Sequence, residues 1–137
     1  MRDLVRDPKN RETKLAVIPD GYFQLATDST PLGFAVELDR GTVEEKPFKA
    51  KIRALGEWKV KGAYQRRFGT DSLRVLFVVA PTDRDRKRLE RIKAWTETEG
   101  GQSLFWFASL SDLWPDTIFD KPVWRVAGRD GRFALFD

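Results

Sequence analysis

The stretch "LRVLFVVAP" (Leu73–Pro81) constrains the fold more than any other part of the sequence. It is a continuous apolar run rich in β-branched residues, a pattern typical of a strand that is covered on both faces. The segment after it, "PTDRDRKRLERIKAWTETEGG", predicts a helix, and "SLFWFASL" (Ser103–Leu110) predicts a second buried strand. Strands that alternate with helices in this way predict an α/β domain with a mixed β-sheet flanked by helices.

The helix between these two strands has recognisable ends. Thr82 is the expected N-cap, and the glycine pair Gly100 and Gly101 ends the helix. Its narrow apolar stripe consists of Leu89, Ile92 and Trp95 or Thr96. Residues 42–68 should also be mostly helical, because apolar residues recur there at helical spacing, although Gly56 and Gly62 weaken the second half.

The two ends of the chain differ in character. Residues 1–14 are polar and interrupted by Pro8, and we expect a flexible lead-in to a single domain over residues 15–137. Met1 is followed by charged residues, so we expect no signal peptide. The tail "PVWRVAGRDGRFALF" predicts a terminal hairpin around "GRDG".

Two short apolar strands, residues 15–25 and 33–40, are joined by the turn-rich connection "ATDSTPL". Side chains alternate between the two faces of a strand, and paired residues of an antiparallel hairpin share a face. For the apolar sets to meet, Phe23 should lie opposite Val36, or in a register that differs by an even number of residues. A slip of one residue would mix the two faces, so hydrophobic burial fixes the register within this limit.

This hairpin brings three carboxylates together. In the predicted register Asp20 lies opposite Asp39, with Glu37 diagonal to Asp20. Like charges across two strands are unfavourable, so the carboxylates need cations, a shared proton or a bound metal ion. One interpretation is a hydrated outer face balanced by Lys14, Arg40 or lysines of the following helix. The other is a site for a divalent metal ion.

Composition excludes several kinds of chemistry. The chain has no histidine and no cysteine, which excludes histidine-dependent nucleophilic catalysis, histidine zinc sites, thiolate metal sites and disulfides. No glycine-rich phosphate loop of the known types occurs. Hydrolytic chemistry would therefore depend on carboxylates, lysines and a hard cation such as Mg²⁺. The absence of cysteine fits a cytoplasmic protein, and no apolar run is long enough to cross a membrane.

The segment "VIPDGYFQL…FAVELDRGT", with "PD" at Pro19 and Asp20, resembles the core of the PD-(D/E)XK nuclease superfamily, which has the restriction-endonuclease-like fold. With the downstream "FKAKIRAL", "RVLFVVAP" and "RLERIKAW", residues 15–124 look more narrowly like the bacterial replication-relaxation family. The resemblance implies a DNA-binding, Mg²⁺-dependent endonuclease, with Mn²⁺ as a possible substitute.

The resemblance also implies roles for individual residues. Asp20 and Glu37 match the two acidic positions of the motif, and both would act as catalytic metal ligands; Asp39 is a possible third ligand. Asp39 occupies the position at which the superfamily has a lysine, so another lysine has to replace it. We expect Lys51, which lies beside the buried stripe of the following helix, and Lys49 as the second choice.

Charge is distributed unevenly along the chain. Residues 40–93 contain 16 Lys and Arg against 7 Asp and Glu, an excess of nine positive charges, whereas the remainder is acidic. This concentration suits a polyanionic partner, although solvated helix faces would have the same composition. The expected nucleic-acid contacts are Arg40, Lys49, Lys87, Arg88 and Arg91. The alternative function is a catalytically inactive nuclease-like module that binds DNA or a replication or mobilisation partner. Besides DNA, the expected partners include another protein or further copies of the chain.

Overall fold

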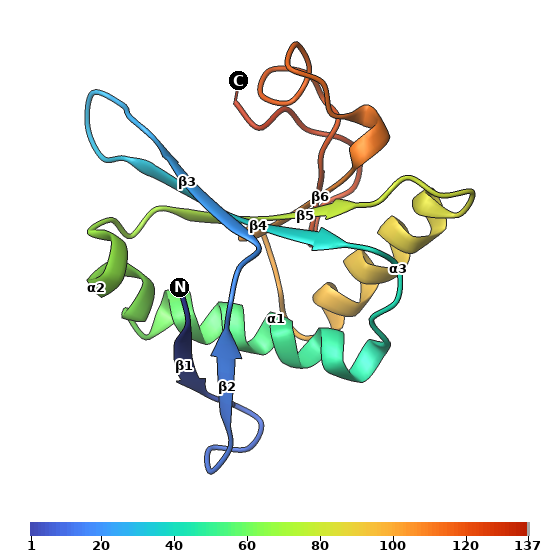
Figure 1. Ribbon diagram of the computed structural model, residues 1–137. Helices are drawn as coiled ribbons and strands as arrows, with labels where there is room; N and C mark the ends of the chain where they lie inside the picture. The colour runs from blue at the N-terminus through green and yellow to red at the C-terminus, as the bar shows by residue number, and fades with distance from the viewer. Residues whose placement is uncertain (137) are drawn as a thin grey trace.

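The computed structural model describes residues 1–136 and contains a five-stranded mixed sheet with helices against one face (Figure 1). The expected α/β class, with a mixed sheet flanked by helices, is confirmed. The strands lie in chain order: β3 (Gly21–Leu25), β4 (Leu32–Asp39), β5 (Leu73–Val79), β6 (Phe105–Ser109) and β7 (Arg125–Val126). The three central strands are parallel, and the two edge strands run antiparallel to their neighbours.

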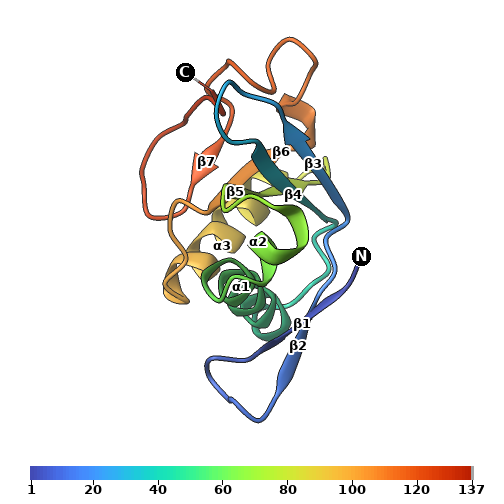
Figure 2. The same ribbon diagram turned by 90° about the vertical axis from the view of Figure 1, so that its left-hand side faces the viewer.

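Both faces of the sheet are covered, which explains why every residue of β5 except Arg74 is apolar. On one face lie α1 (Glu45–Val60), α2 (Ala63–Phe68) and α3 (Asp85–Thr98), as Figure 2 shows. The core on that face includes Ile52, Leu55, Trp58, Phe77, Ile92 and Phe107. On the other face, the C-terminal segment with the short 3₁₀-helix η1 (Leu110–Asp112) covers a second core of Phe34, Leu76, Trp106, Trp124, Val126 and Leu135.

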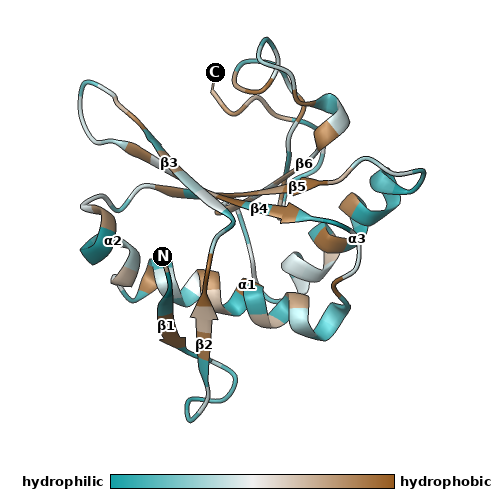
Figure 3. Ribbon diagram, viewed as in Figure 1, coloured by the Kyte–Doolittle hydropathy of each residue, from teal (hydrophilic) through white to brown (hydrophobic). Residues whose placement is uncertain are grey.

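The helices follow the expected pattern, with one break. The segment predicted as one helical stretch divides at Gly62, whose positive φ of 83° ends α1 and begins α2. In α3 the predicted stripe of Leu89, Ile92 and Thr96 is buried. Figure 3 shows apolar residues concentrated in the sheet and polar residues along α3 and the loops. The N-cap of α3 is Arg84 rather than Thr82. The Thr82 hydroxyl lies just outside the helix and accepts a hydrogen bond from the backbone N–H of Arg84.

The N-terminal residues differ from the flexible lead-in that we expected. They form β1 (Asp3–Arg6), which pairs antiparallel with β2 (Lys14–Val17) and packs against α1. Polar residues hold this sheet in place: the Asp3 carboxylate accepts hydrogen bonds from the Trp58 indole and from Arg67. The first strand of the domain therefore begins at Asp3 rather than at residue 15.

The C-terminal hairpin is present in a reduced form. Trp124 and Phe133 exchange two backbone hydrogen bonds, of 3.1 and 2.7 Å, on either side of the predicted "GRDG" turn. Trp106 and Trp124 are buried, whereas Trp114 is 62% exposed. No helix within residues 1–136 is long and apolar enough to span a bilayer.

Candidate functional site

The β3–β4 hairpin has a register two residues away from the simplest one that the sequence predicts. Phe23 pairs with Phe34 and Gly21 with Val36, an even shift, so the apolar faces are preserved. Extending this register by one residue brings Asp20 opposite Glu37 rather than Asp39. On the helix-facing side of the hairpin, Gly33 lies beneath the hydroxyls of Tyr22 and Tyr64 and has no room for a side chain.

Asp20 lies just before β3 at the carboxyl edge of β4. Its Oδ2 accepts a hydrogen bond of 2.7 Å from the backbone N–H of Leu38, which holds the carboxylate next to β4. The other carboxylate oxygen has no hydrogen-bond partner among residues 1–136. Asp20 is therefore fixed through one oxygen, and the second oxygen remains available to a ligand.

Glu37 is the central group of the site. It points to the helix-covered face of β4, whereas its neighbours Val36 and Leu38 point to the other face, and its side chain is 4% exposed. Burial raises the pKa of the Glu37 carboxyl to about 7; the positive charge of Lys51 opposes this change, and the Asp20 carboxylate adds to it. A buried carboxyl whose negative charge is incompletely compensated favours the approach of a cation.

Lys51, on the second turn of α1, is the cation nearest to Glu37. Its Nζ lies 3.6 Å from Glu37 Oε2, and its side chain is 42% exposed, so the ammonium group contacts both the carboxylate and solvent. Lys49 instead forms an ion pair with Glu45 on the same helix, at 2.7 Å. Of the two lysines that the sequence predicts as candidates, only Lys51 forms an ion pair with Glu37.

Asp39 has a different environment from the one that we expected for a metal ligand. Both of its oxygens accept hydrogen bonds of 2.8 Å from the Arg88 guanidinium, and the two side chains are almost completely buried. Within residues 1–136 no group of three or more acidic side chains is arranged to hold a metal ion. The predicted set of three ligands is thus reduced to Asp20 and Glu37, because Arg88 neutralises Asp39.

Asp20 and Glu37 are a donor set that Mg²⁺ accepts. In proteins this ion is commonly held by one or two carboxylates, and waters and substrate phosphate oxygens complete its octahedral coordination. The unpartnered oxygen of Asp20 and the buried, poorly compensated Glu37 would be the two carboxylates that hold such an ion. Mn²⁺ has the same preference for oxygen ligands.

A basic hollow opens at the carboxyl ends of β4 and β5. Its volume is about 560 Å³, and its basic lining residues are Arg40, Arg84, Lys87, Arg88 and Arg91. Four of the five residues that the sequence predicts as nucleic-acid contacts therefore line this hollow, and Lys49 does not. Arg84 was not among the predicted contacts, although the helical spacing of positions 84, 87, 88 and 91 is a signal that could have revealed it.

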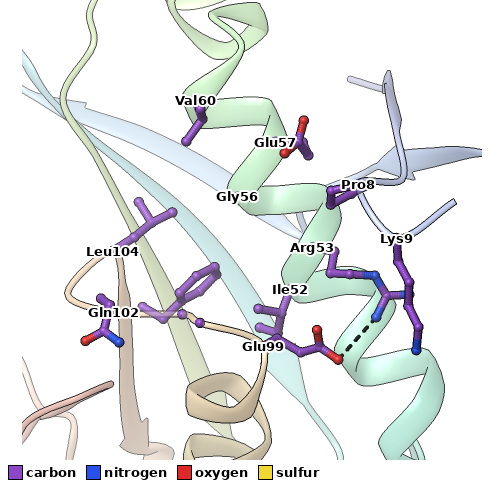
Figure 4. Close-up of a pocket in the computed structure, with 13 residues that line it drawn as sticks. Pro8, Lys9, Ile52, Arg53, Gly56, Glu57, Val60, Glu99, Gln102 and Leu104 are labelled. Carbon is purple, nitrogen blue, oxygen red and sulfur yellow. Dashed lines mark hydrogen bonds and ion pairs between the residues drawn. The ribbon is translucent and has the colours of Figure 1, made fainter. Parts of the chain in front are cut away.

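A second hollow, of about 480 Å³, lies between α1 and the loop that joins α3 to β6 (Figure 4). Ile52, Leu104 and Phe105 line it, and the Arg53–Glu99 ion pair of 3.3 Å crosses one side. It lies beside the amino end of β6, whereas Glu37 is near the carboxyl end of β4, and it contains none of the predicted site residues.

Comparisons of this chain with protein-family models, with curated proteins and with solved structures found no match.

Proposed function

We propose that this chain is a metal-dependent nuclease of the PD-(D/E)XK type, related to the replication-relaxation family, that hydrolyses phosphodiester bonds of DNA in the cytoplasm. The observation that carries the proposal is the convergence of Asp20, Glu37 and Lys51 at one edge of the sheet. The hairpin that contains both carboxylates is followed by a helix and a parallel strand, the order expected for the core of that superfamily.

Each residue has a separate role in this proposal. Asp20 and Glu37 would hold Mg²⁺ or Mn²⁺, which when bound polarises a phosphate and lowers the pKa of a water molecule. The partly exposed Lys51 ammonium lies beside Glu37, where it can orient the attacking water and offset the negative charge that develops on the phosphate oxygens. Lys51 would thereby replace the lysine that is missing at position 39.

A second candidate function is favoured by the Asp39–Arg88 pair. The position of the superfamily lysine is occupied here by an acid whose two oxygens both bind Arg88. A chain that had lost catalysis would tolerate this change, and would keep the fold and the basic surface for binding DNA or a protein partner.

The two candidates are separated by cleavage assays with Mg²⁺ or Mn²⁺ on single-stranded, duplex and branched DNA. For a nuclease, Asp20→Asn abolishes cleavage and leaves DNA binding unchanged or improved, because it removes a negative charge while keeping the shape. Lys51→Ala lowers the rate by about 10²- to 10³-fold, the usual effect of losing one preorganised contact to the transition state.

Lys49→Ala is the matched control, because this lysine lies on the same helix but pairs with Glu45. It should cleave at the parental rate. If the unmodified protein binds DNA but cleaves none of the three substrates with either metal ion, the binding module replaces the nuclease as the function. Equal losses in the two lysine variants would contradict the specific role of Lys51.

A further inference from the structure

The basic hollow at the carboxyl ends of β4 and β5 contains positive charge that the fold does not use. Four of its cations, Arg40, Arg84, Lys87 and Arg91, are exposed and make no ion pair or side-chain hydrogen bond with residues 1–136. Asp83 is the only acidic residue among the residues that line it. Some cations elsewhere do have an acidic partner, as in the pairs of Lys59 with Asp71 and Arg67 with Asp3.

The geometry of α3 explains why these cations converge. Positions 84, 87, 88 and 91 lie three or four residues apart, so they share one face at the N-terminal end of the helix. Leu89 and Ile92 on the adjoining face are buried against the sheet and fix the rotation of the helix. Arg40 reaches the same hollow from the end of β4.

Arg88 has a different role from the other four. Besides its two hydrogen bonds to Asp39, it donates to the backbone carbonyl of Val43 at 2.9 Å and lies over the Trp95 ring at 5.3 Å. It is therefore a positioning residue: it ties α3 to the end of β4 and to the segment that leads into α1. The acid at position 39 thus holds the helix that bears the free cations.

We propose that this hollow is a phosphate-binding subsite for a nucleic-acid strand, separate from the metal-binding carboxylates. The proposal rests on the proposed function, which assigns the reacting phosphate to Glu37 near the end of β4; Arg40 directly follows β4, three residues after Glu37. Unpaired guanidinium and ammonium groups bind phosphate oxygens through charge-assisted hydrogen bonds. A hollow of about 560 Å³ has room for a phosphate together with its sugar. The group bound is a phosphate of the same strand, internal or terminal.

Binding measured without cleavage tests the subsite independently of catalysis. The probe is a fluorescein-labelled single-stranded DNA oligonucleotide, titrated with the full chain in EDTA and followed by anisotropy. Arg84→Gln, Lys87→Gln and Arg91→Gln should each weaken binding by about tenfold, the loss of one charge-assisted contact. The triple variant should lose at least about a hundredfold, and Lys121→Gln, an exposed cation of the C-terminal segment, should bind within about twofold of the parent.

Two further arms identify the source of the phosphate. We expect oligonucleotides with a hydroxyl or a phosphate at the 5′ end to bind equally, since a strand that reaches Glu37 brings internal phosphates to the hollow. A preference for the phosphorylated end that disappears in the triple variant supports the same subsite with a terminal phosphate as its source. Poly-glutamate is the competing probe. If it binds as tightly as DNA, and if the triple variant loses this binding to the same extent, an acidic protein replaces nucleic acid as the ligand.

The outcomes keep this inference distinct from the proposed nuclease. A triple variant that binds DNA as tightly as the parent would overturn the subsite, even if the protein cleaves DNA through Glu37. If the parent cleaves no DNA but the triple variant binds DNA more weakly than the parent, the subsite is supported and the nuclease function is excluded. The three side chains are exposed and outside both cores, so unfolding midpoints equal to that of the parent will show that the variants are folded.

Discussion

Glu37 makes the stability of this protein depend on pH. Its pKa rises from an ordinary value of 4.5 to about 7 on folding, because burial penalises the charged form. Between these two values the folded chain holds a proton that the unfolded chain has released, so the free energy of unfolding falls as the pH rises. The loss is on the order of 3 kcal/mol at most, and little further change from this residue follows above about pH 7.

Glu37→Gln should remove this dependence. Urea unfolding at about pH 5 and about pH 8 should show a smaller loss of stability for the variant than for the parent, because glutamine does not titrate. Glu12→Gln, a change of the same kind at an exposed position between β1 and β2, is the control and should retain the parental dependence. An identical pH dependence in the parent and in Glu37→Gln would mean that Glu37 titrates normally in the folded protein.

At the scale of whole elements, sequence patterns predicted those helices and strands whose signal lies within a single segment of the chain. The apolar run at β5 and the helical stripe of α3 are strong local signals, and both elements formed where they were expected. The choice of Lys51 over Lys49 also followed from helical spacing. The hairpin register did not follow from the sequence, because registers two residues apart bury the same apolar face.

The pairing of Asp39 with Arg88 and the docking of β1 were hidden for a different reason. Each depends on a partner about fifty residues away, and no periodicity links an acid on one strand to a particular arginine on a later helix. The distribution of charge along the sequence revealed the basic segment. Only the fold shows that five basic residues line one hollow, while Lys49 pairs with Glu45.

The first strand provides a test at this scale. The Trp58 side chain is fully buried, and its indole N–H donates to Asp3 at 2.8 Å, so Asp3→Ala leaves a buried donor without its partner. This should lower the free energy of unfolding by about 1–3 kcal/mol, measured by urea denaturation. Asp28→Ala, in the exposed loop between β3 and β4, is the control and should change stability by less than about 0.5 kcal/mol. A neutral Asp3→Ala would indicate that residues 1–14 are the flexible lead-in after all.

For the molecule as a whole, the carboxyl edge of the sheet combines two opposite electrostatic features. A pair of carboxylates lies at the ends of β3 and β4, and a hollow with four unpaired cations lies beside β5 and α3. Under the two proposals, and in the absence of a metal ion, the carboxylates would repel a phosphate strand while the hollow would attract it. The strand should therefore be held first by the cations, and a divalent ion should strengthen binding further by neutralising Asp20 and Glu37.

This arrangement gives a quantitative expectation for salt dependence. If each of the four free cations neutralises one phosphate, the logarithm of the binding constant should fall against the logarithm of salt concentration with a slope of about −3.6 on duplex DNA and about −2.8 on a single strand. Anisotropy titrations in EDTA across a salt series measure both slopes. Asp20→Asn should raise the affinity at every salt concentration and leave the slope unchanged, because it removes a repulsion without adding a phosphate contact. Binding that is insensitive to salt would exclude phosphate contacts as its basis, whatever residues line the hollow.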